Sequence, residues 1–341
     1  MSTQNANPPL PTGESLGIAG LSFRSFRDES DYPLMLDVVQ KSKVADQDEW
    51  TTSVEDITRD YRHLRNCDAK ADMIFAEIDG VPVGYGRTWW EDERKGDRVF
   101  CLFANLVPEW RGRGIRRALL DWLEARARTV AAANPTEKTE LLQTWASEFE
   151  TDANRLYTEA GYEIVRWEYE MIRSLDQPID EAPLPEGIEI RPVTDADAPR
   201  IFEAAHEAFA DHWGETEWFT PKDLEEWREG PTYNPSIWKI AFDGDEVVGT
   251  VMNYVHEKEN EEYGRQRGHT ESICVRKAWR GRGIAKALIA ESMRMHQAMG
   301  MTETCHGVDT QNPTGALQLY EGLGYVPKRT FYTYRKALKG A

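Results

Sequence analysis

The chain has 341 residues, which is enough for two ordinary domains that each bury a sizeable core. Its formal net charge of −18 argues against a protein that binds a nucleic-acid backbone, because such a protein needs a basic face. The four cysteines lie far apart without C-x-x-C spacing, which argues against a metal site or a disulfide framework and fits a reducing cytoplasm. No apolar run approaches the ~20 residues of a membrane span.

At the start of the chain, residues 1–20 are rich in proline and glycine and lack the cationic and apolar regions of a signal peptide. We therefore expect a disordered tail there. An N-terminal domain is expected at residues 21–174 and a C-terminal domain at residues 187–341. Between them, residues 175–186 contain three prolines and four acidic residues, which predicts a linker because prolines neither continue a helix nor pair in a central strand.

The two domains are predicted to be repeats of one fold, because the chain matches itself at an offset of roughly 165 residues. The clearest pair is the hexapeptide WRGRGI, at residues 110–115 and again at residues 279–284. Further pairs follow in the same order in both halves: Phe23 with Ile190, Trp50 with Trp218, Gly80 with Gly244, Tyr157 with Tyr320, and Tyr162 with Tyr325.

Each half is expected to contain a strand, two helices, a strand hairpin, a long third strand, a glycine turn with a helix, a strand, a short helix and closing strands. This order predicts an α/β (α+β) fold, in which a mixed and mainly antiparallel sheet is flanked by helices. In the second half, the strongly polar residues 257–268 are expected to form a solvated loop, with a substrate-gating flap as the alternative.

Residues 271–299 are expected to form a buried strand, a glycine-rich turn and an amphipathic helix. The turn, RGRG at residues 280–283, would expose backbone N–H groups at the positive end of the helix, where an anion is held without a side chain. Five cations lie between residues 276 and 286 of this acidic chain, which suggests a polyanionic small ligand. The alternative is an ordinary strand-to-helix turn.

The hexapeptide RGRGIA at residues 280–285 fits the Q/R-x-x-G-x-G/A acyl-CoA-binding motif, and here the chain resembles the GNAT superfamily of N-acetyltransferases. Residues 312–325, NPTGALQLYEGLGY, resemble the GNAT signature N-x-x-A-x-x-L-Y-x-x-x-G-F with one extra residue between Asn and Tyr. The resemblance covers most of both halves and implies two tandem GNAT domains. Chain length and tandem architecture are similar to those of the mycothiol synthase type.

The resemblance implies acetyl-CoA as the co-substrate. In the family pattern, the strand backbone pairs with the pantetheine amides and the glycines let the backbone approach the pyrophosphate. Arg280 occupies a motif position, whereas Arg282 and Lys286 are equally compatible with surface charge. Asn312 would contact the pantetheine arm, cap the following helix, or both. The implied cofactor-binding residues are Ile273, Cys274, Val275, Arg280, Gly281, Arg282, Gly283, Ile284, Ala285, Lys286 and Asn312.

The N-terminal repeat keeps the glycines of the motif but has Arg116 at its last position, where the family has Gly or Ala. The long cationic side chain would either crowd the pyrophosphate or bind it. We expect this domain to be degenerate and to support the C-terminal one.

Acetyl transfer needs a neutral amine, stabilisation of the charge on the carbonyl oxygen, and a proton for the departing thiolate. Tyr320 lies where many GNATs place the general acid; the alternative is an aromatic ring that packs on the cofactor. For the general base, Glu271 is the first candidate, and Asp309 and His306 are the next. A base is not essential if the amine binds partly deprotonated.

Four aromatic residues fall where GNATs build the acceptor pocket from the first two helices, although such residues often only pack in the core. They are Trp213, Trp218, Phe219 and Trp227.

Together these patterns predict a cytoplasmic N-acetyltransferase that moves an acetyl group from acetyl-CoA to a primary amine of a small molecule or peptide. No metal, nucleic-acid or membrane partner is expected, and the protein would be a monomer or a homodimer. The alternative is a non-catalytic acyl-CoA-binding or scaffold protein. An RNA-modifying enzyme would need a basic patch beyond the cofactor loop, which the charge balance does not supply.

Overall fold

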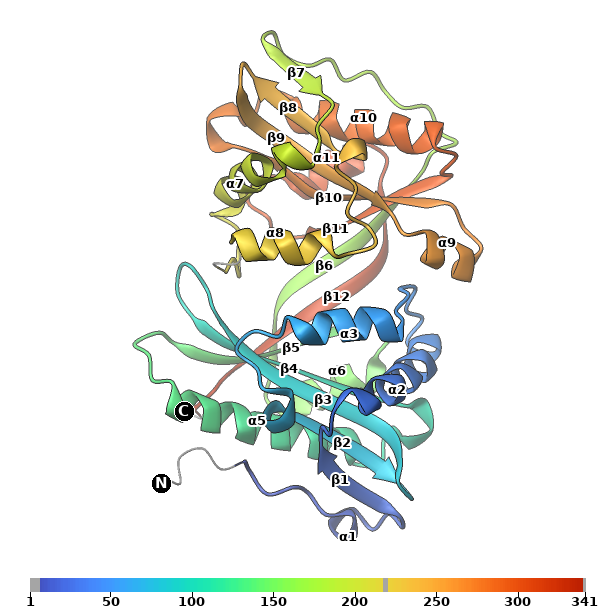
Figure 1. Cartoon of the computed structure of the whole chain (residues 1–341), viewed down its shortest axis with the longest axis vertical. Helices are drawn as coiled ribbons and strands as arrows, with labels where there is room; N and C mark the ends of the chain where they lie inside the picture. The colour runs from blue at the N-terminus through green and yellow to red at the C-terminus, as the bar shows by residue number, and fades with distance from the viewer. Residues whose placement is uncertain (1–6, 217–219, 340–341) are drawn as a thin grey trace. The chain divides into compact units, whose positions relative to one another are not determined.

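The computed structural model describes residues 7–216 and 220–339 and divides into two compact units (Figure 1). The N-terminal unit consists of residues 1–166 together with residues 331–341. The C-terminal unit consists of residues 167–330. Both have the expected mixed α/β architecture, with helices on the faces of a mainly antiparallel sheet.

The N-terminal unit follows the expected order of elements. Its helices are α1 (Gly13–Leu16), α2 (Tyr32–Ala45), α3 (Val54–Arg62), α4 (Ala69–Asp72), α5 (Ile115–Ala133) and α6 (Thr151–Glu159). Its strands are β1 (Leu21–Ser25), β2 (Met73–Ile78), β3 (Val81–Asp92), β4 (Arg98–Leu106) and β5 (Glu140–Ser147), with part of β12 (Val326–Ala337). The sheet order is β1-β2-β3-β4-β5-β12, in which β4 and β5 run parallel and the other neighbours antiparallel.

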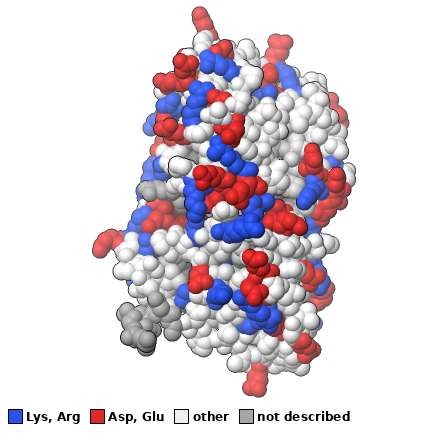
Figure 2. All heavy atoms as spheres, viewed as in Figure 1, with Lys and Arg blue, Asp and Glu red and all other residues white. Residues whose placement is uncertain are grey.

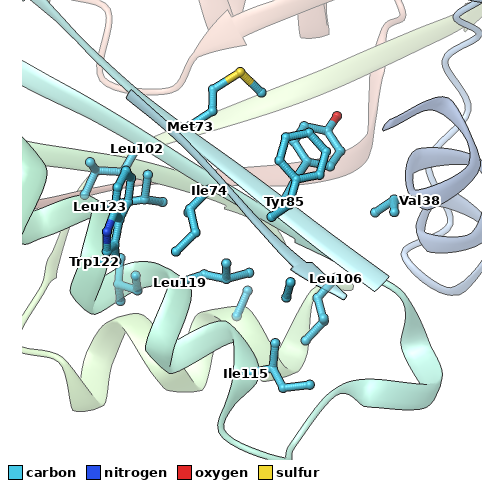
Figure 3. Close-up of a cluster of buried hydrophobic side chains, with 14 of the residues drawn as sticks. Val38, Met73, Ile74, Tyr85, Leu102, Leu106, Ile115, Leu119, Trp122 and Leu123 are labelled. Atoms are coloured by element: carbon cyan, nitrogen blue, oxygen red, sulfur yellow. The ribbon is translucent and has the colours of Figure 1, made fainter. Parts of the chain in front are cut away.

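The core of the N-terminal unit occupies both faces of this sheet, because side chains alternate along each strand. Helix α5 packs on β2, β3 and β4, while α2 packs on β3 and β4. Figure 3 shows Leu119 of α5 next to Ile74 and Ile115 next to Leu106 on one side of the strands, with Tyr85 and Val38 of α2 on the other.

The C-terminal unit repeats this arrangement. Its helices are α7 (Ala198–Phe209), α8 (Pro221–Arg228), α9 (Glu257–Tyr263), α10 (Ile284–Ala298) and α11 (Ala316–Gly322). Its strands are β6 (Glu163–Ser174, from residue 167), β7 (Ile188–Arg191), β8 (Lys239–Asp243), β9 (Glu246–Val255), β10 (Arg267–Val275), β11 (Glu303–Asp309) and the start of β12. The order β7-β8-β9-β10-β11-β6 contains one parallel pair, β10 with β11, among antiparallel ones.

Two hydrophobic clusters lie on the two faces of the C-terminal sheet. Val248, on β9, belongs to the cluster with Leu288 of α10 and Tyr320 of α11. Its neighbour Val247 belongs to the cluster with Phe202 of α7. The two valines point to opposite faces because successive strand residues alternate.

The two repeats exchange their last strands. Strand β6 follows α6 of the first repeat along the chain but pairs with β11, over residues 168–174. Strand β12 follows α11 of the second repeat, and its residues 331–337 pair with β5. The two compact units therefore do not contain the same residues as the domains expected from the sequence, 21–174 and 187–341. The expected linker, residues 175–186, contains neither helix nor strand.

Two segments differ from the expectations of local composition. Within residues 7–20, expected to be part of a disordered tail, α1 forms and Trp122 Nε1 donates to the Pro8 carbonyl at 3.2 Å. Leu16 and Ile18 pack against the N-terminal core, and this burial orders a segment that is rich in proline and glycine.

The polar residues 257–268, expected to form a loop, instead contain helix α9 and the start of β10. His256 caps the helix by accepting from the Glu259 N–H at 3.2 Å. Asn260 is buried and exchanges two hydrogen bonds of 3.0 Å with the backbone of Arg267, which ties the helix to the strand.

None of the helices in the two described ranges combines the length and the apolar character that crossing a lipid bilayer demands.

The exchanged strand β12 makes a testable contribution to stability. Tyr334 is 2% exposed, donates its hydroxyl to Asn154 Oδ1 at 2.8 Å and packs with Tyr157. We expect Tyr334→Ala to lower the unfolding free energy of the N-terminal unit by about 3–5 kcal/mol, as for other large-to-small core changes. Chemical denaturation followed by circular dichroism measures this. The exposed Lys339→Ala should change it by less than ~0.5 kcal/mol, and equal effects of the two changes would contradict the pairing of β12 with β5.

Candidate active site

A cavity of about 610 Å³ lies in the C-terminal unit, a size typical of small-molecule sites. Its walls come from the end of β10, the end of β11, the first turns of α10 and α11, and the end of α7. These are the elements that the repeat pattern and the glycine turn singled out.

The cavity forms where two parallel strands separate. Strand β10 pairs with β11 only over residues 267–269, although both strands continue beyond this point. A bulge follows at residues 271–274, where Ser272 has a φ of 48°. Thr250 Oγ1 donates to the Ser272 carbonyl at 2.6 Å and so stabilises this strained backbone.

The glycine turn leads into α10 without a side-chain cap. Gly281 and Gly283 have φ values of 76° and 86°, which glycine adopts without steric cost. Because the first backbone N–H groups of a helix have no intrahelical partner, those of Ile284, Ala285 and Lys286 are available at the positive end of the helix. A Cβ atom built on either glycine meets nothing within 4 Å, so the turn is open.

Arg280 fixes the turn to its neighbours. Its Nε donates to the Val275 carbonyl at 2.9 Å and its Nη2 to the Ala208 carbonyl at 2.7 Å. The guanidinium therefore ties the turn to the end of β10 and to α7, and its charge also borders the cavity.

All but one of the cofactor-binding residues implied by the resemblance line this cavity. The exception, Arg282, is exposed and is not among the lining residues. Those that do line it are Ile273, Cys274, Val275, Arg280, Gly281, Gly283, Ile284, Ala285, Lys286 and Asn312.

Asn312 does not cap helix α11, contrary to one of its two expected roles. The N-cap is Gly315, and Asn312 Oδ1 instead accepts from the Thr314 N–H at 2.9 Å and from the Thr314 hydroxyl at 2.7 Å. The extra residue between Asn312 and Tyr320 accounts for this, because it moves the asparagine into a separate turn before the helix.

Tyr320 lines the cavity and is only 6% exposed. Burial raises the pKa of its phenol above the ordinary value, and the neighbouring Tyr325, Glu271 and Cys274 add to the shift. The hydroxyl is therefore protonated throughout the neutral range.

Glu271 also lines the cavity, at the start of the bulge. Its side chain is exposed to the cavity. The protein atoms around the cavity wall nevertheless desolvate the carboxyl and raise its pKa to about 7. A carboxylate with this pKa accepts a proton efficiently near neutral pH.

The two other candidate bases differ in position. Asp309 lines the cavity. His306 is 2% exposed and is not a lining residue, and burial lowers the pKa of its imidazole to about 3. It therefore has no access to an acceptor in the cavity.

Trp213 is the one described member of the four expected acceptor-site aromatics that lines the cavity. Trp227 packs in the core against Trp238 with nearly parallel rings. Trp218 and Phe219 lie outside the described residues.

Sequence reasoning missed two titratable residues of the lining, His212 and Glu168. His212 immediately precedes Trp213, and this adjacency is the signal that could have identified it. No local signal marks Glu168, because it reaches the C-terminal unit only through the strand exchange.

In the N-terminal unit, the counterpart of Ala285 is Arg116, and its side chain turns inward. It is 5% exposed, and its guanidinium lies 3.5 Å from Asp152 and 3.9 Å from Glu150, on and just before α6. Ala285 and Gly315, at the corresponding positions of α10 and α11, both line the cavity of the C-terminal unit. The ion pairs of Arg116 thus bridge the starts of α5 and α6, the N-terminal counterparts of the two helix starts that border that cavity.

One glycine of the N-terminal turn has a neighbour that its counterpart lacks. A Cβ atom on Gly114 would meet Leu16 of α1 at 3.1 Å, whereas the equivalent Gly283 faces open space. The first repeat therefore keeps the conformation of the turn, with a φ of 86° at Gly114, but has a side chain of α1 beside its second glycine.

Comparisons with known proteins find the same family in both halves of the chain. Residues 234–327 match the family described as acetyltransferase (GNAT) domain, and residues 36–162 match the acetyltransferase (GNAT) family. A mycothiol acetyltransferase from Salinispora arenicola is 29% identical and covers 91% of this chain and 95% of its own length. One from Streptomyces scabiei is 32% identical, covering 74% and 76%.

Solved structures share the whole architecture. A GCN5-related N-acetyltransferase from Sphaerobacter thermophilus is 26% identical, with a TM-score of 0.70 over 98% of both chains. A tandem GNAT protein from the clavulanic acid biosynthesis pathway, 13% identical, has the same fold with a TM-score of 0.65 over 94% of this chain and 99% of its own.

The open glycine turn generates a prediction for coenzyme A, the ligand that its motif implies. We expect Gly283→Ala to weaken coenzyme A binding at least ~10-fold, because a Cβ at a φ of 86° forces the first turn of α10 to shift. Isothermal titration calorimetry measures the affinity, and the wild type should bind one equivalent per chain.

Gly300→Ala is the matched control. Gly300 follows the other end of α10, has a φ of 84° and also faces open space, so the substitution carries the same strain away from the cavity. Equal loss of affinity in both variants would show that helix strain, and not the turn, governs binding.

Proposed function

The chain belongs to the GNAT family of acetyltransferases and moves an acetyl group from acetyl-CoA to an amine, and we propose that the transfer takes place in the cavity of the C-terminal unit. The observation that carries this proposal is the convergence of an open glycine turn, an unpaired strand end, a carboxylate and a phenol on one cavity. The N-terminal unit would support the fold without turnover.

The described residues fit acetyl-CoA along the length of the cavity. The free N–H groups at the start of α10 would hold the diphosphate, with Lys286 nearby. The backbone of Ile273–Val275, beyond the point where β10 stops pairing with β11, would bond the pantetheine amides as an added strand does. Asn312 borders the same wall. The bound thioester supplies the activated acetyl group.

Glu271 would remove the proton of the incoming ammonium, directly or through a water molecule. The backbone N–H groups near Val275 would stabilise charge on the carbonyl oxygen. Tyr320 would donate its proton to the departing thiolate, a role that requires the phenol to stay protonated until the carbon–sulfur bond breaks. The raised pKa values of both residues support this division of roles.

The acidic residues of the cavity wall support an amine acceptor. Glu168, Glu271 and Asp309 line the cavity, and their carboxylates would attract an ammonium. Because the relatives are named mycothiol acetyltransferases, we infer that the acceptor is the primary amine of a small molecule of the mycothiol type. On the face in Figure 2, Lys and Arg side chains are intermixed with Asp and Glu, which gives no support to a nucleic-acid acceptor.

The N-terminal unit is the part of the chain that favours the scaffold alternative. There, Arg116 pairs with Asp152 at the start of α6, and Leu16 lies beside the glycine turn at Gly114. The open cavity of the C-terminal unit favours the enzyme. A reducing cytoplasm fits the free cysteines.

Substitution of the proposed acid separates the two functions. We expect Tyr320→Phe to retain coenzyme A affinity while thiol release from acetyl-CoA in the presence of amine slows at least ~10-fold, because the thiolate loses its proton donor. A thiol-trapping dye follows the release. Tyr157→Phe, at the equivalent buried position of the N-terminal unit, should keep the wild-type rate. An unchanged rate for Tyr320→Phe would place the acid elsewhere, and a wild type inactive across a panel of amines would favour the scaffold.

The pH dependence tests the proposed base. Glu271 acts when ionised, so kcat/KM should rise as the pH increases through its pKa of about 7. Glu271→Gln should lower kcat/KM at least ~10-fold at pH 8 and remove this rise, which is the acidic limb of the pH profile. Asp309→Asn, which changes the other carboxylate candidate, should keep the limb. If the limb disappears only in Asp309→Asn, the two roles are reversed.

A further inference from the structure

His306 is a buried titratable residue beside the proposed acid, and the chemistry described above leaves it unused. It lies on β11 and is 2% exposed. Its imidazole centroid is 3.9 Å from the ring of Tyr320 and 4.4 Å from that of Tyr325. Since Tyr320 lines the cavity and His306 does not, the imidazole contacts the phenol ring from within the protein.

The side-chain hydrogen bond of His306 indicates which tautomer of its imidazole is present. The Thr270 hydroxyl donates to the Cys305 carbonyl at 3.2 Å, so its oxygen is left to accept from His306 Nδ1–H at 3.4 Å. In this tautomer Nε2 carries no proton, and among the described residues it has no hydrogen-bond partner. Burial lowers the pKa of the imidazole to about 3, so the ring is neutral at the pH of the reaction.

We propose that His306 is a positioning residue that acts through Tyr320, by holding the phenol ring with its hydroxyl toward the thiolate and by keeping water from the inner side of that ring. The proposal rests on the proposed function, in which Tyr320 is the proton donor.

Two physical reasons connect the contact to the reaction. A proton donor contributes to the rate only when its hydroxyl is aligned with the atom that receives the proton, and small displacements lower the rate steeply. The dry environment also keeps the phenol protonated. Tyr325, Glu271 and Cys274 face Tyr320 as well, and all three favour its neutral form. A water molecule in place of the imidazole would remove both effects.

The experiment compares His306→Ala with His306→Phe in the full chain. For His306→Ala we expect kcat to fall at least ~10-fold while the KM for acetyl-CoA stays within ~2-fold, because the acid is misplaced but the cofactor contacts remain. His306→Phe keeps a ring of similar size and should retain kcat within ~3-fold. It also serves as the readout if the alanine variant does not fold.

The pH profile adds a signature that a purely structural residue would not move. Tyr320 must be protonated to act, so kcat is lost as the pH rises through its pKa. Water beside the ring in His306→Ala brings that pKa back toward its ordinary value, and the alkaline limb of kcat should therefore move to lower pH. The limb should stay in place in His306→Phe.

A double-mutant cycle tests whether the effect passes through Tyr320. In a Tyr320→Phe background, His306→Ala should change kcat by less than ~2-fold, since the hydroxyl that it positions is gone. Met293→Ala is the control, because Met293 is fully buried in α10 of the same unit and its truncation also leaves a core cavity. It should lower the melting temperature and leave kcat within ~2-fold.

The outcomes separate the two proposals. Equal losses of kcat from His306→Ala in both backgrounds, or an equal loss from Met293→Ala, would overturn the positioning role. The positioning role would also be overturned if His306→Ala keeps the kcat of the wild type while Tyr320→Phe is impaired. That result would leave the proposed function standing. If the wild type releases no thiol with any amine, the proposed function fails and the positioning role fails with it.

Discussion

The candidate active site depends on the separation of two parallel strands. Strands β10 and β11 pair for three residues and then part, with a bulge and a residue of positive φ at the point of divergence. Backbone strain of this kind costs on the order of 1–3 kcal/mol, and the hydrogen bond from Thr250 to Ser272 offsets part of it. Without the divergence, β10 would present a paired edge to β11, and neither a cavity nor an unpaired backbone would exist between them.

The same divergence explains the electrostatics of the cavity. It places Glu271, on the bulge, in the cavity wall, where the surrounding protein atoms raise the pKa of its carboxyl to about 7 by desolvation. Tyr320, from α11, lines the same cavity and is buried against the core. The same surroundings therefore bring a carboxyl to a pKa near neutrality and keep a phenol protonated. The cation of the motif, Arg280, contributes mainly by tying the turn to β10 and α7.

The features that sequence predicted well are local ones. The glycine turn, the helix after it and the hairpins follow from residue types at fixed spacing, and comparing one half of the chain with the other strengthened each assignment. The assignment of Glu271, Tyr320 and the cofactor-binding residues to roles stays a prediction, although all except Arg282 line the cavity.

The features that sequence missed depend on tertiary contacts. Helix α9 lies in a stretch whose composition indicates a loop, and it is held there by the buried Asn260. Residues 7–20 are ordered by the contacts of Leu16 and Ile18 with the core. Strand β6 has the same period whichever neighbour it pairs with, so its pattern alone does not reveal that Glu168 reaches the cavity of the C-terminal unit. Burial against distant residues decided each case.

The exchange of β6 and β12 has a consequence for how the protein is made. A nascent chain emerges from the ribosome starting at its N-terminus, and most domains fold as soon as their own residues are available. Here β5 waits for residues 331–337, which are synthesised only after most of the second repeat. Until they arrive, one side of β5 is an exposed strand edge of the kind that invites association with other chains. Nascent copies on one messenger would thus face a risk of mispairing throughout translation of the second repeat, and the first unit is completed only when the ribosome has passed through the second.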